Sequence, residues 1–154
     1  MGILSGILSL FGCGHKVEST KNFNQLAKQI EITELDRELN LLDRNKTDFD
    51  FIGITSNGID CIYFVKENDK FQIEFEAMTR DQIPYIDKLK SFANQNAYET
   101  QMTTYGNKPQ YNALEAPVLK ILTNSNLEKT AEIAREIQTT IFKNRSETKY
   151  DVVP

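Results

Sequence analysis

The sequence predicts an α+β domain in which helices pack on an antiparallel sheet. Two observations carry this prediction: three short strands separated by turn signals, and amphipathic helical patterns on both sides of them. The 154 residues are 40% apolar and 26% charged, which fits a single soluble domain. We expect five strands in the order α-βββ-α-ββ-α over residues 16–143, preceded by an apolar segment at 1–15 and followed by a loose polar tail at 144–154.

The three central strands fall within residues 49–77. Asn57-Gly58 is the strongest short hairpin signal in the chain, because a type I′ turn needs positive φ at both central positions. Asn68-Asp69 marks the second turn. Between the turns the residues are β-branched and aromatic, and after the second turn apolar and polar residues alternate strictly.

Two-residue loops at both turns fix which residues share a face of the sheet. They pair Ile54 with Cys61 and Phe64 with Ile73. The predicted core face then consists of Phe49, Phe51, Ile62, Phe64, Phe71, Ile73 and Phe75. The opposite face is half apolar and half acidic, with Ile52, Ile54, Cys61, Tyr63 and Val65 beside Gln72, Glu74 and Glu76.

The apolar half of that opposite face requires a cover. A helix of the same chain, a second subunit and a client protein are the three alternatives. The surface that we expect a client to contact consists of Ile52, Ile54, Tyr63 and Val65.

The helices are predicted from apolar periodicity and capping residues. Residues 23–42 form one bent helix or two short ones. Thr79 and Gln82 make a capping box that starts a helix over residues 80–97.

The second half of the domain continues with two more strands and a closing helix. Residues 98–105 and 117–122 are the fourth and fifth strands. Ser125 and Glu128 make a second capping box, which opens the last helix.

The first fourteen residues are uncharged and carry one apolar stripe at helical spacing: Ile3, Leu4, Ile7, Leu8 and Phe11. The segment is too short to span a bilayer. It is interpreted as an amphipathic segment that contacts a membrane or a partner, or as a short helix against its own domain or a frayed terminus. Leu10-Phe11-Gly12-Cys13 also loosely resembles a bacterial lipoprotein box, which would make Cys13 a lipidation site and the protein membrane-associated.

Composition excludes several function classes. One His and two Cys are too few for a His- or Cys-based metal cluster, so we expect no metal. A net charge of −4 argues against nucleic-acid binding. Cys13 and Cys61 lie in unlike contexts and are interpreted as unrelated thiols of a reducing, cytoplasmic compartment.

Catalytic signatures are also missing from the sequence. It has no phosphate-binding Gly-rich loop and no nucleophile elbow. Glu74 and Glu76 are interpreted as a solvated strand edge, like Asp48 and Asp50. We therefore expect a protein-binding module without a cofactor, ahead of a membrane-associated accessory protein and of a small enzyme of unknown class.

The stretch APVLKILTNSNLEKTAEIAREIQTTIF, residues 116–142, places a short apolar strand and a polar turn before a closing helix. This order, with the chain's length and acidity, resembles the type III secretion chaperone-like superfamily, which includes the Tir chaperone (CesT-like) proteins and the YbjN-like sensory transduction regulators. The resemblance covers residues 23–143. It implies a non-enzymatic chaperone-like or adaptor domain that binds an extended client. It also implies a homodimer formed through the second helix and the fourth strand, at Tyr85, Leu89, Phe92, Met102 and Tyr105.

Overall fold

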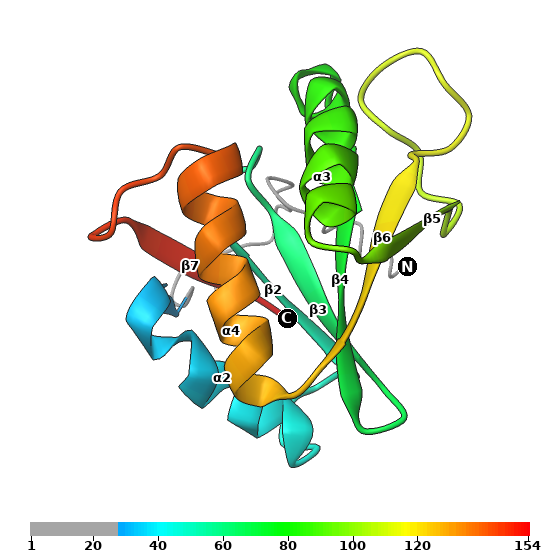
Figure 1. Cartoon of the computed structure of the whole chain (residues 1–154). Helices are drawn as coiled ribbons and strands as arrows, with labels where there is room; N and C mark the ends of the chain where they lie inside the picture. The colour runs from blue at the N-terminus through cyan, green and yellow to red at the C-terminus, as the bar shows by residue number, and fades with distance from the viewer. Residues whose placement is uncertain (1–27) are drawn as a thin grey trace, which may run out of the picture.

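Residues 28–154 are described by the computed structural model, and they form one antiparallel sheet with three helices on one of its faces (Figure 1). The strands are β1 (Gln29–Glu31), β2 (Phe51–Thr55), β3 (Ile62–Glu67), β4 (Lys70–Glu76), β5 (Glu99–Thr103), β6 (Val118–Ser125) and β7 (Lys149–Val153). The helices are α2 (Leu35–Asp43), α3 (Ile83–Gln95) and α4 (Leu127–Glu136). The predicted α+β class is confirmed, but the sheet has seven strands, in the order β1-β7-β2-β3-β4-β6-β5, instead of five.

The two additional strands come from segments that were expected to be a helix and a loose tail. β1 lies inside the predicted helix 23–42, and within the described part of that range the α-helix begins only at Leu35. β7 lies inside the predicted polar tail and pairs with β1 on one side and β2 on the other. Its Tyr150 is 2% exposed and belongs to the core. The expectation of a loose tail is therefore wrong.

The hydrophobic core lies between the sheet and its three helices. α2 packs beside α4, and α3 packs on β5 and β6. The strands contribute Ile30, Ile52, Ile54, Ile62, Phe64, Phe71, Ile73, Phe75, Leu119, Ile121 and Tyr150. The helices contribute Leu35, Leu39, Leu42, Leu89, Phe92, Ala93, Ala131, Ile133 and Ala134.

The register of β2 differs by one residue from the prediction. Ile54 pairs with Ile62, and Ile52 pairs with Phe64. Side chains alternate between the faces of a strand, so this shift moves all of β2 to the other face. Ile52 and Ile54 are 3% and 0% exposed in the core, so their assignment to a partner-binding surface is wrong. Phe51, which was predicted to lie in the core, is instead half-buried on the opposite face of the sheet, where Ile52 and Ile54 had been predicted.

The register shift follows from a longer loop at Asn57-Gly58. Gly58 has a φ of 84°, but Asn57 is not in the left-handed region, so no type I′ turn forms. The loop instead folds around the buried carboxylate of Asp60, which accepts hydrogen bonds from Thr55 Oγ1 and from the backbone N–H of Ser56, both at 2.8 Å. Six residues, 56–61, therefore separate β2 from β3.

The second turn follows the prediction. Asn68 and Asp69 both have positive φ, 52° and 65°, and Glu67 pairs with Lys70 across them. Phe64 pairs with Ile73 as expected. The acidic positions of β4 accordingly lie on the face away from the helices.

Of the two predicted capping boxes, the one before α3 is confirmed, and the one before α4 is shifted by one residue. Thr79 and Gln82 form the predicted capping box, ahead of a 3₁₀ turn at Arg80–Gln82 and then α3. α4 is capped by Asn126, whose side chain accepts from the N–H of Lys129. Ser125, the predicted cap, is instead the last residue of β6. Its hydroxyl oxygen forms a hydrogen bond with Thr130 Oγ1, and the two oxygens are 2.7 Å apart. A π-helical turn, Ile137–Ile141, extends α4.

The predictions for the N-terminal segment, on Ile3, Leu4, Ile7, Leu8, Phe11 and Cys13, lie outside the described residues. Within residues 28–154, none of the helices is long and apolar enough to cross a bilayer.

Candidate functional site

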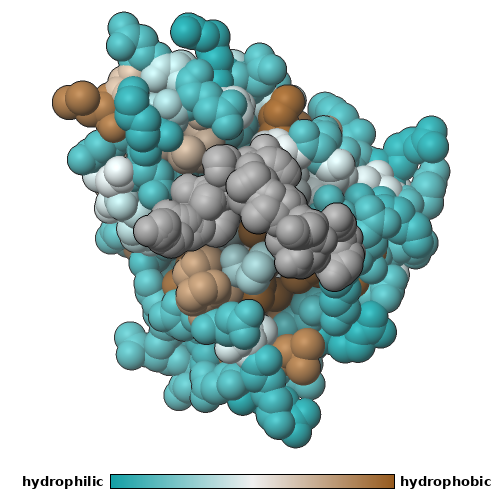
Figure 2. All heavy atoms as spheres, turned by 180° about the vertical axis from the view of Figure 1, so that it is seen from behind, coloured by the Kyte–Doolittle hydropathy of each residue, from teal (hydrophilic) through white to brown (hydrophobic). Residues whose placement is uncertain are grey.

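The face of the sheet away from the helices is here called the back face. It carries two groups of side chains that lie outside the core, one aromatic and one charged. Figure 2 shows apolar atoms on this side of the molecule within a largely hydrophilic surface. β2 and β3 contribute aromatic residues, and β3, β4 and β6 contribute charged ones. The face therefore has an apolar half and a charged half, as predicted. Its apolar half differs from the prediction because Phe51 replaces Ile52 and Ile54.

The apolar half is the aromatic patch, defined as Phe49, Phe51, Tyr63 and Val65. The rings of Phe49 and Phe51 stack with centroids 5.3 Å apart, and Tyr63 meets Phe51 edge-on at 5.9 Å. Gly53 makes room for this arrangement, because a Cβ there would lie 2.7 Å from Cδ1 of the Tyr63 ring. Phe49 is 55% exposed, and the other three residues are half-buried. The patch is a small, preformed apolar surface.

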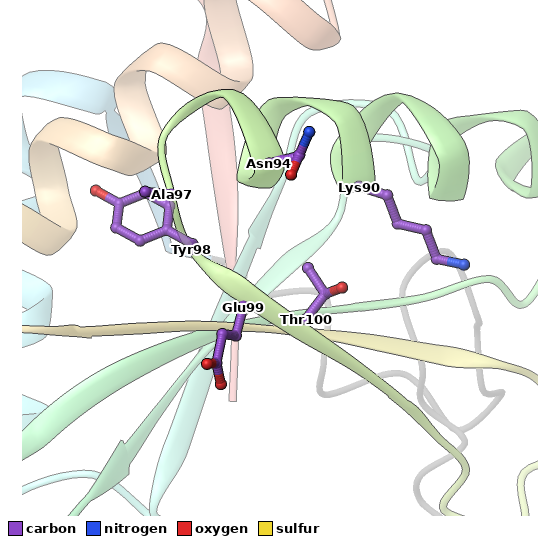
Figure 3. A pocket seen from close by; sticks show the side chains of 6 residues that line it. All are labelled: Lys90, Asn94, Ala97, Tyr98, Glu99 and Thr100. Carbon is purple, nitrogen blue, oxygen red and sulfur yellow. The ribbon is translucent and has the colours of Figure 1, made fainter.

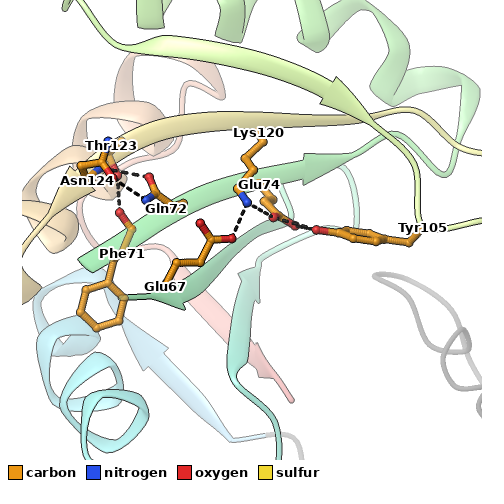
Figure 4. A network of polar contacts seen from close by, with 8 residues as sticks. All are labelled: Glu67, Phe71, Gln72, Glu74, Tyr105, Lys120, Thr123 and Asn124. Atoms are coloured by element: carbon orange, nitrogen blue, oxygen red, sulfur yellow. Dashed lines mark hydrogen bonds and ion pairs between the residues drawn. The ribbon is translucent and has the colours of Figure 1, made fainter. Parts of the chain in front are cut away.

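The charged half is the polar cluster, defined as Glu67, Glu74, Tyr105 and Lys120 (Figure 4). Tyr105 Oη lies 2.9 and 2.8 Å from the two carboxylate oxygens of Glu74 and donates to that carboxylate. Lys120 Nζ forms an ion pair with Glu67 and lies 3.9 Å from Glu74 Oε2. β4 and β6 are neighbours in the sheet, which brings Lys120 directly opposite Glu74.

Burial dominates the electrostatics of this cluster. It raises the pKa of the Glu74 carboxyl above the ordinary value of 4.5, against the lowering effects of the Tyr105 hydrogen bond and the Lys120 charge. Burial, followed by the Glu74 charge, raises the pKa of the Tyr105 hydroxyl. Burial likewise raises the pKa of Glu76.

We expect the Glu74→Gln variant to gain stability relative to the parent as the pH rises from acid to neutral. The quantity compared is the difference between their free energies of unfolding. The raised pKa in the folded state means that stability is highest below the unfolded pKa and is lost as pH rises through the folded pKa. Gln keeps an acceptor for Tyr105 but carries no charge. Urea unfolding from about pH 4 to about pH 7 should shift in favour of the variant by on the order of 1 kcal/mol.

The exposed Glu128→Gln serves as the control and should show no such trend. A Glu74→Gln variant whose relative stability falls on raising the pH would contradict the cost assigned to burying this carboxylate.

The connection between β5 and β6 is fastened to the end of β4. Asn107 Nδ2 donates to Glu76 Oε2 at 2.7 Å, and Tyr111 Oη donates to the carbonyl of Ala77 at 2.7 Å. The N–H of Gln110 also donates to the carbonyl of Met78. These bonds hold the loop on the β4 side of β6, away from the outer side of β5.

β5 is consequently an edge strand that is paired on one side only among the described residues. It is five residues long, pairs with β6 without a bulge, and contains no Pro and no Lys. The opposite edge, β1, has three residues and runs directly into a 3₁₀ turn, which limits further pairing. β5 is therefore the more accessible of the two edges for another strand.

A hollow of about 490 Å³ lies beside the start of β5, against the C-terminal half of α3 (Figure 3). Lys90, Asn94 and Ala97 line it from the helix side, and Tyr98, Glu99 and Thr100 line it from the strand side. In Figure 3, Thr100 points toward α3 and Glu99 points away from it. The hollow forms a groove between α3 and the strand edge that no other described strand pairs with.

The structure separates the residues that were predicted to form a dimer interface. Leu89 and Phe92 are 0% and 5% exposed in the core, so their prediction as interface residues is wrong. Tyr85 is half-buried against Phe142, with ring centroids 4.7 Å apart. Only Met102 and Tyr105, 46% and 60% exposed, remain available, and both lie on or next to β5.

The carboxylates of the back face do not gather into a metal site. Residues 28–154 contain no group of three or more acidic, His or Cys side chains that could hold a metal ion. Glu67, Glu74 and Glu76 face Lys120, Tyr105 and Asn107 instead. The earlier interpretation of Glu74 and Glu76 as a solvated edge is wrong for Glu74, which is 4% exposed.

No protein-family model, no curated protein and no solved structure matches this chain.

Proposed function

We propose that the protein is a non-enzymatic binding module that takes up an extended segment of a partner protein as an additional strand beside β5. The observation that carries this proposal is the outer side of β5, which pairs with no strand among residues 28–154 and runs next to α3. Alternate residues of an edge strand direct their N–H and C=O groups outward. An extended segment satisfies these groups, and the groove beside the strand selects among its side chains.

The edge also lacks the features that normally prevent strand addition. Natural sheets protect their edges with Lys, Pro, bulges or covering loops. β5 has none of these among the described residues. Of the side chains on its back face, Gln101 and Thr103 are uncharged, and Glu99, at the start of the strand, carries its one charge. Retaining such an edge risks aggregation, so its retention supports a role in binding.

The groove indicates what the partner segment contains. Thr100 and Met102 pair with Ile121 and Leu119 of the core, so both lie on the helix side of β5. Lys90 is exposed and makes no ion pair with any residue that the structure describes. We expect an acidic or amide side chain next to Lys90 and Asn94, and an apolar side chain two residues away against Met102.

The remaining chemistry of the back face supports binding over catalysis. The charged groups of the polar cluster are occupied by one another, and none of them lines the hollow. The resemblance to secretion-chaperone-like domains favours the same interpretation, because such domains hold extended polypeptides.

Met102→Lys is expected to weaken binding of such a segment about tenfold or more, which corresponds to about 1.4 kcal/mol. It places a charge on the edge and removes the apolar contact. Leu114→Lys is the matched control, because Leu114 is 87% exposed in the loop away from the edge. Peptides selected from a random displayed library on the full chain would be synthesised and their affinities measured by calorimetry.

Hydrogen exchange locates the bound segment independently of affinity. Selected peptides should slow amide exchange within residues 99–103. Peptides that bind without slowing this exchange, or that bind Met102→Lys as tightly as the parent, would overturn the proposal. Slowing that appears with rising protein concentration alone, together with a dimer mass, would assign the edge to a second copy of the chain instead.

A further inference from the structure

The hydrogen bonds at the start of β6 determine which of its residues face β4 and which face β5. The N–H of Ala77 donates to the carbonyl of Pro117 at 3.0 Å, in the same register in which Glu76 pairs with Val118. Consecutive residues of an antiparallel strand direct their backbone groups to opposite sides. The Pro117 carbonyl faces β4, so the backbone groups of Val118, and of every second residue after it, face β5.

The outward backbone groups of β5 are therefore those of Thr100 and Met102. Thr103 lies opposite Val118, and Gln101 lies two residues away along β5, so the backbone groups of both bond to β6. The N–H and C=O groups of Thr100 and Met102 point away from β6 and meet no strand among residues 28–154. They offer two donors and two acceptors to an added segment.

Two charged side chains flank these groups, one on each face of the sheet. Lys90 and Thr100 line the groove on the helix side, whereas Glu99 points away from α3 (Figure 3). Lys90 and Glu99 are exposed, and neither makes an ion pair with any residue that the structure describes. A paired segment complements them with an acidic or amide residue opposite Thr100 and a basic residue opposite Glu99.

We propose that the partner segment adds antiparallel to β5 and reads, from its N-terminus, apolar, any residue, acidic or amide, basic. These four positions lie opposite Met102, Gln101, Thr100 and Glu99 in turn. The inference rests on the proposed function and adds to it the direction of the segment and the order of its residues. Antiparallel pairs are slightly more stable per residue than parallel ones, and every strand pair of the described sheet is antiparallel.

Residue-resolved amide exchange in the free full chain tests which backbone groups point outward. The amides of Thr100 and Met102 should exchange about tenfold faster or more than those of Gln101 and Thr103. The measurement is made without reductant, because Cys61 is disulfide-bonded and its interpretation as an unrelated thiol is wrong. Equal protection of all four amides, or the opposite alternation, would overturn the assignment.

Two synthetic peptides with identical flanks test the order of residues. We expect the peptide containing Ile-Thr-Asp-Lys to bind about tenfold tighter or more, by calorimetry, than the one containing Lys-Asp-Thr-Ile. Equal or tighter binding of the second peptide would overturn the proposed order. Binding of neither peptide, while library-selected peptides still slow exchange within residues 99–103, would also overturn it. If no selected peptide slows that exchange, the proposed function itself fails.

N-methylation of the first peptide tests the direction without changing its side chains. In the antiparallel pair the Asp N–H donates to β5 and the Thr N–H points away, and in a parallel pair these roles are exchanged. Methylation at Asp should weaken binding about tenfold or more, and methylation at Thr should leave it unchanged. The opposite result would overturn the antiparallel direction.

Charge reversal tests the contact with Lys90. Lys90→Glu should weaken binding of the first peptide several-fold, and a peptide with Lys in place of its Asp should restore it. Lys46→Glu is the matched control, because Lys46 is exposed after α2, which packs on β2 and β3. Binding that Lys46→Glu weakens equally, or that the exchanged peptide does not restore, would contradict this contact.

Discussion

Removal of residues 149–154 is expected to abolish cooperative folding. β7 is an interior strand, so its loss leaves β2 with an unpaired edge and β1 with no partner in the sheet. It also removes Tyr150, one of the largest fully buried side chains. Loss of a buried aromatic side chain alone costs about 3–5 kcal/mol, a large part of the 5–15 kcal/mol that stabilises a typical domain.

Urea unfolding followed by circular dichroism measures this effect. Deletion of Pro154, which follows β7 and is exposed, serves as the control and should leave the midpoint unchanged. Tyr150→Ala should fall between the two. A truncated chain that unfolds with the parent's midpoint and slope would show that β7 contributes nothing to the sheet.

Asp60→Ala is expected to be the most damaging single substitution in the loops. The Asp60 carboxylate accepts from Thr55 Oγ1, from Ser56 N–H and Oγ, and from Asn144 Nδ2 at 2.7 Å. Alanine removes the acceptor of the Thr55 and Ser56 donors, and one of the two acceptors of Asn144 Nδ2, in a site where Asp60 is 1% exposed. Each unsatisfied buried group costs about 1–3 kcal/mol, so we expect a loss of about 3–5 kcal/mol in unfolding free energy.

Two companion variants separate the carboxylate from the loop itself. Asp60→Asn keeps one acceptor oxygen and should lose less. Asn57→Ala removes an acceptor for the N–H groups of Ile59 and Asp60 at the exposed tip and should cost about 1 kcal/mol. An Asp60→Ala variant as stable as Asn57→Ala would contradict the central position of the carboxylate in this loop.

The two hairpins show what local sequence can and cannot specify. Asn68-Asp69 adopts the expected turn, and no side chain among residues 28–154 is seen to bind its backbone groups. Asn57-Gly58 carries the stronger turn signal, yet the Asp60 side chain captures the surrounding N–H groups and lengthens the loop. A turn propensity is a local property, whereas this carboxylate is also held by Asn144, far along the chain.

Strand β7 and the polar cluster could not be predicted from the sequence, because both depend on pairing between segments that are far apart in the chain. Lys149 and Asp151 make the tail look solvated, and only pairing with β1 and β2 buries Tyr150 between them. Lys120 was placed correctly in the fifth strand, but its position opposite Glu74 depends on β6 inserting between β4 and β5. The strict alternation in β4 did predict which of its side chains share the acidic side, because that pattern is contained in one strand.

β7 also sets an order of assembly. It leaves the ribosome after every other described strand, and β1, the first of them, has no other partner in the sheet. The five strands β2 to β6 can associate during synthesis, but β1 must wait with its backbone groups solvated until β7 arrives. Closure of the sheet thus joins the first and the last of its described strands in one late step, during which the edge of β2 stays open to other chains.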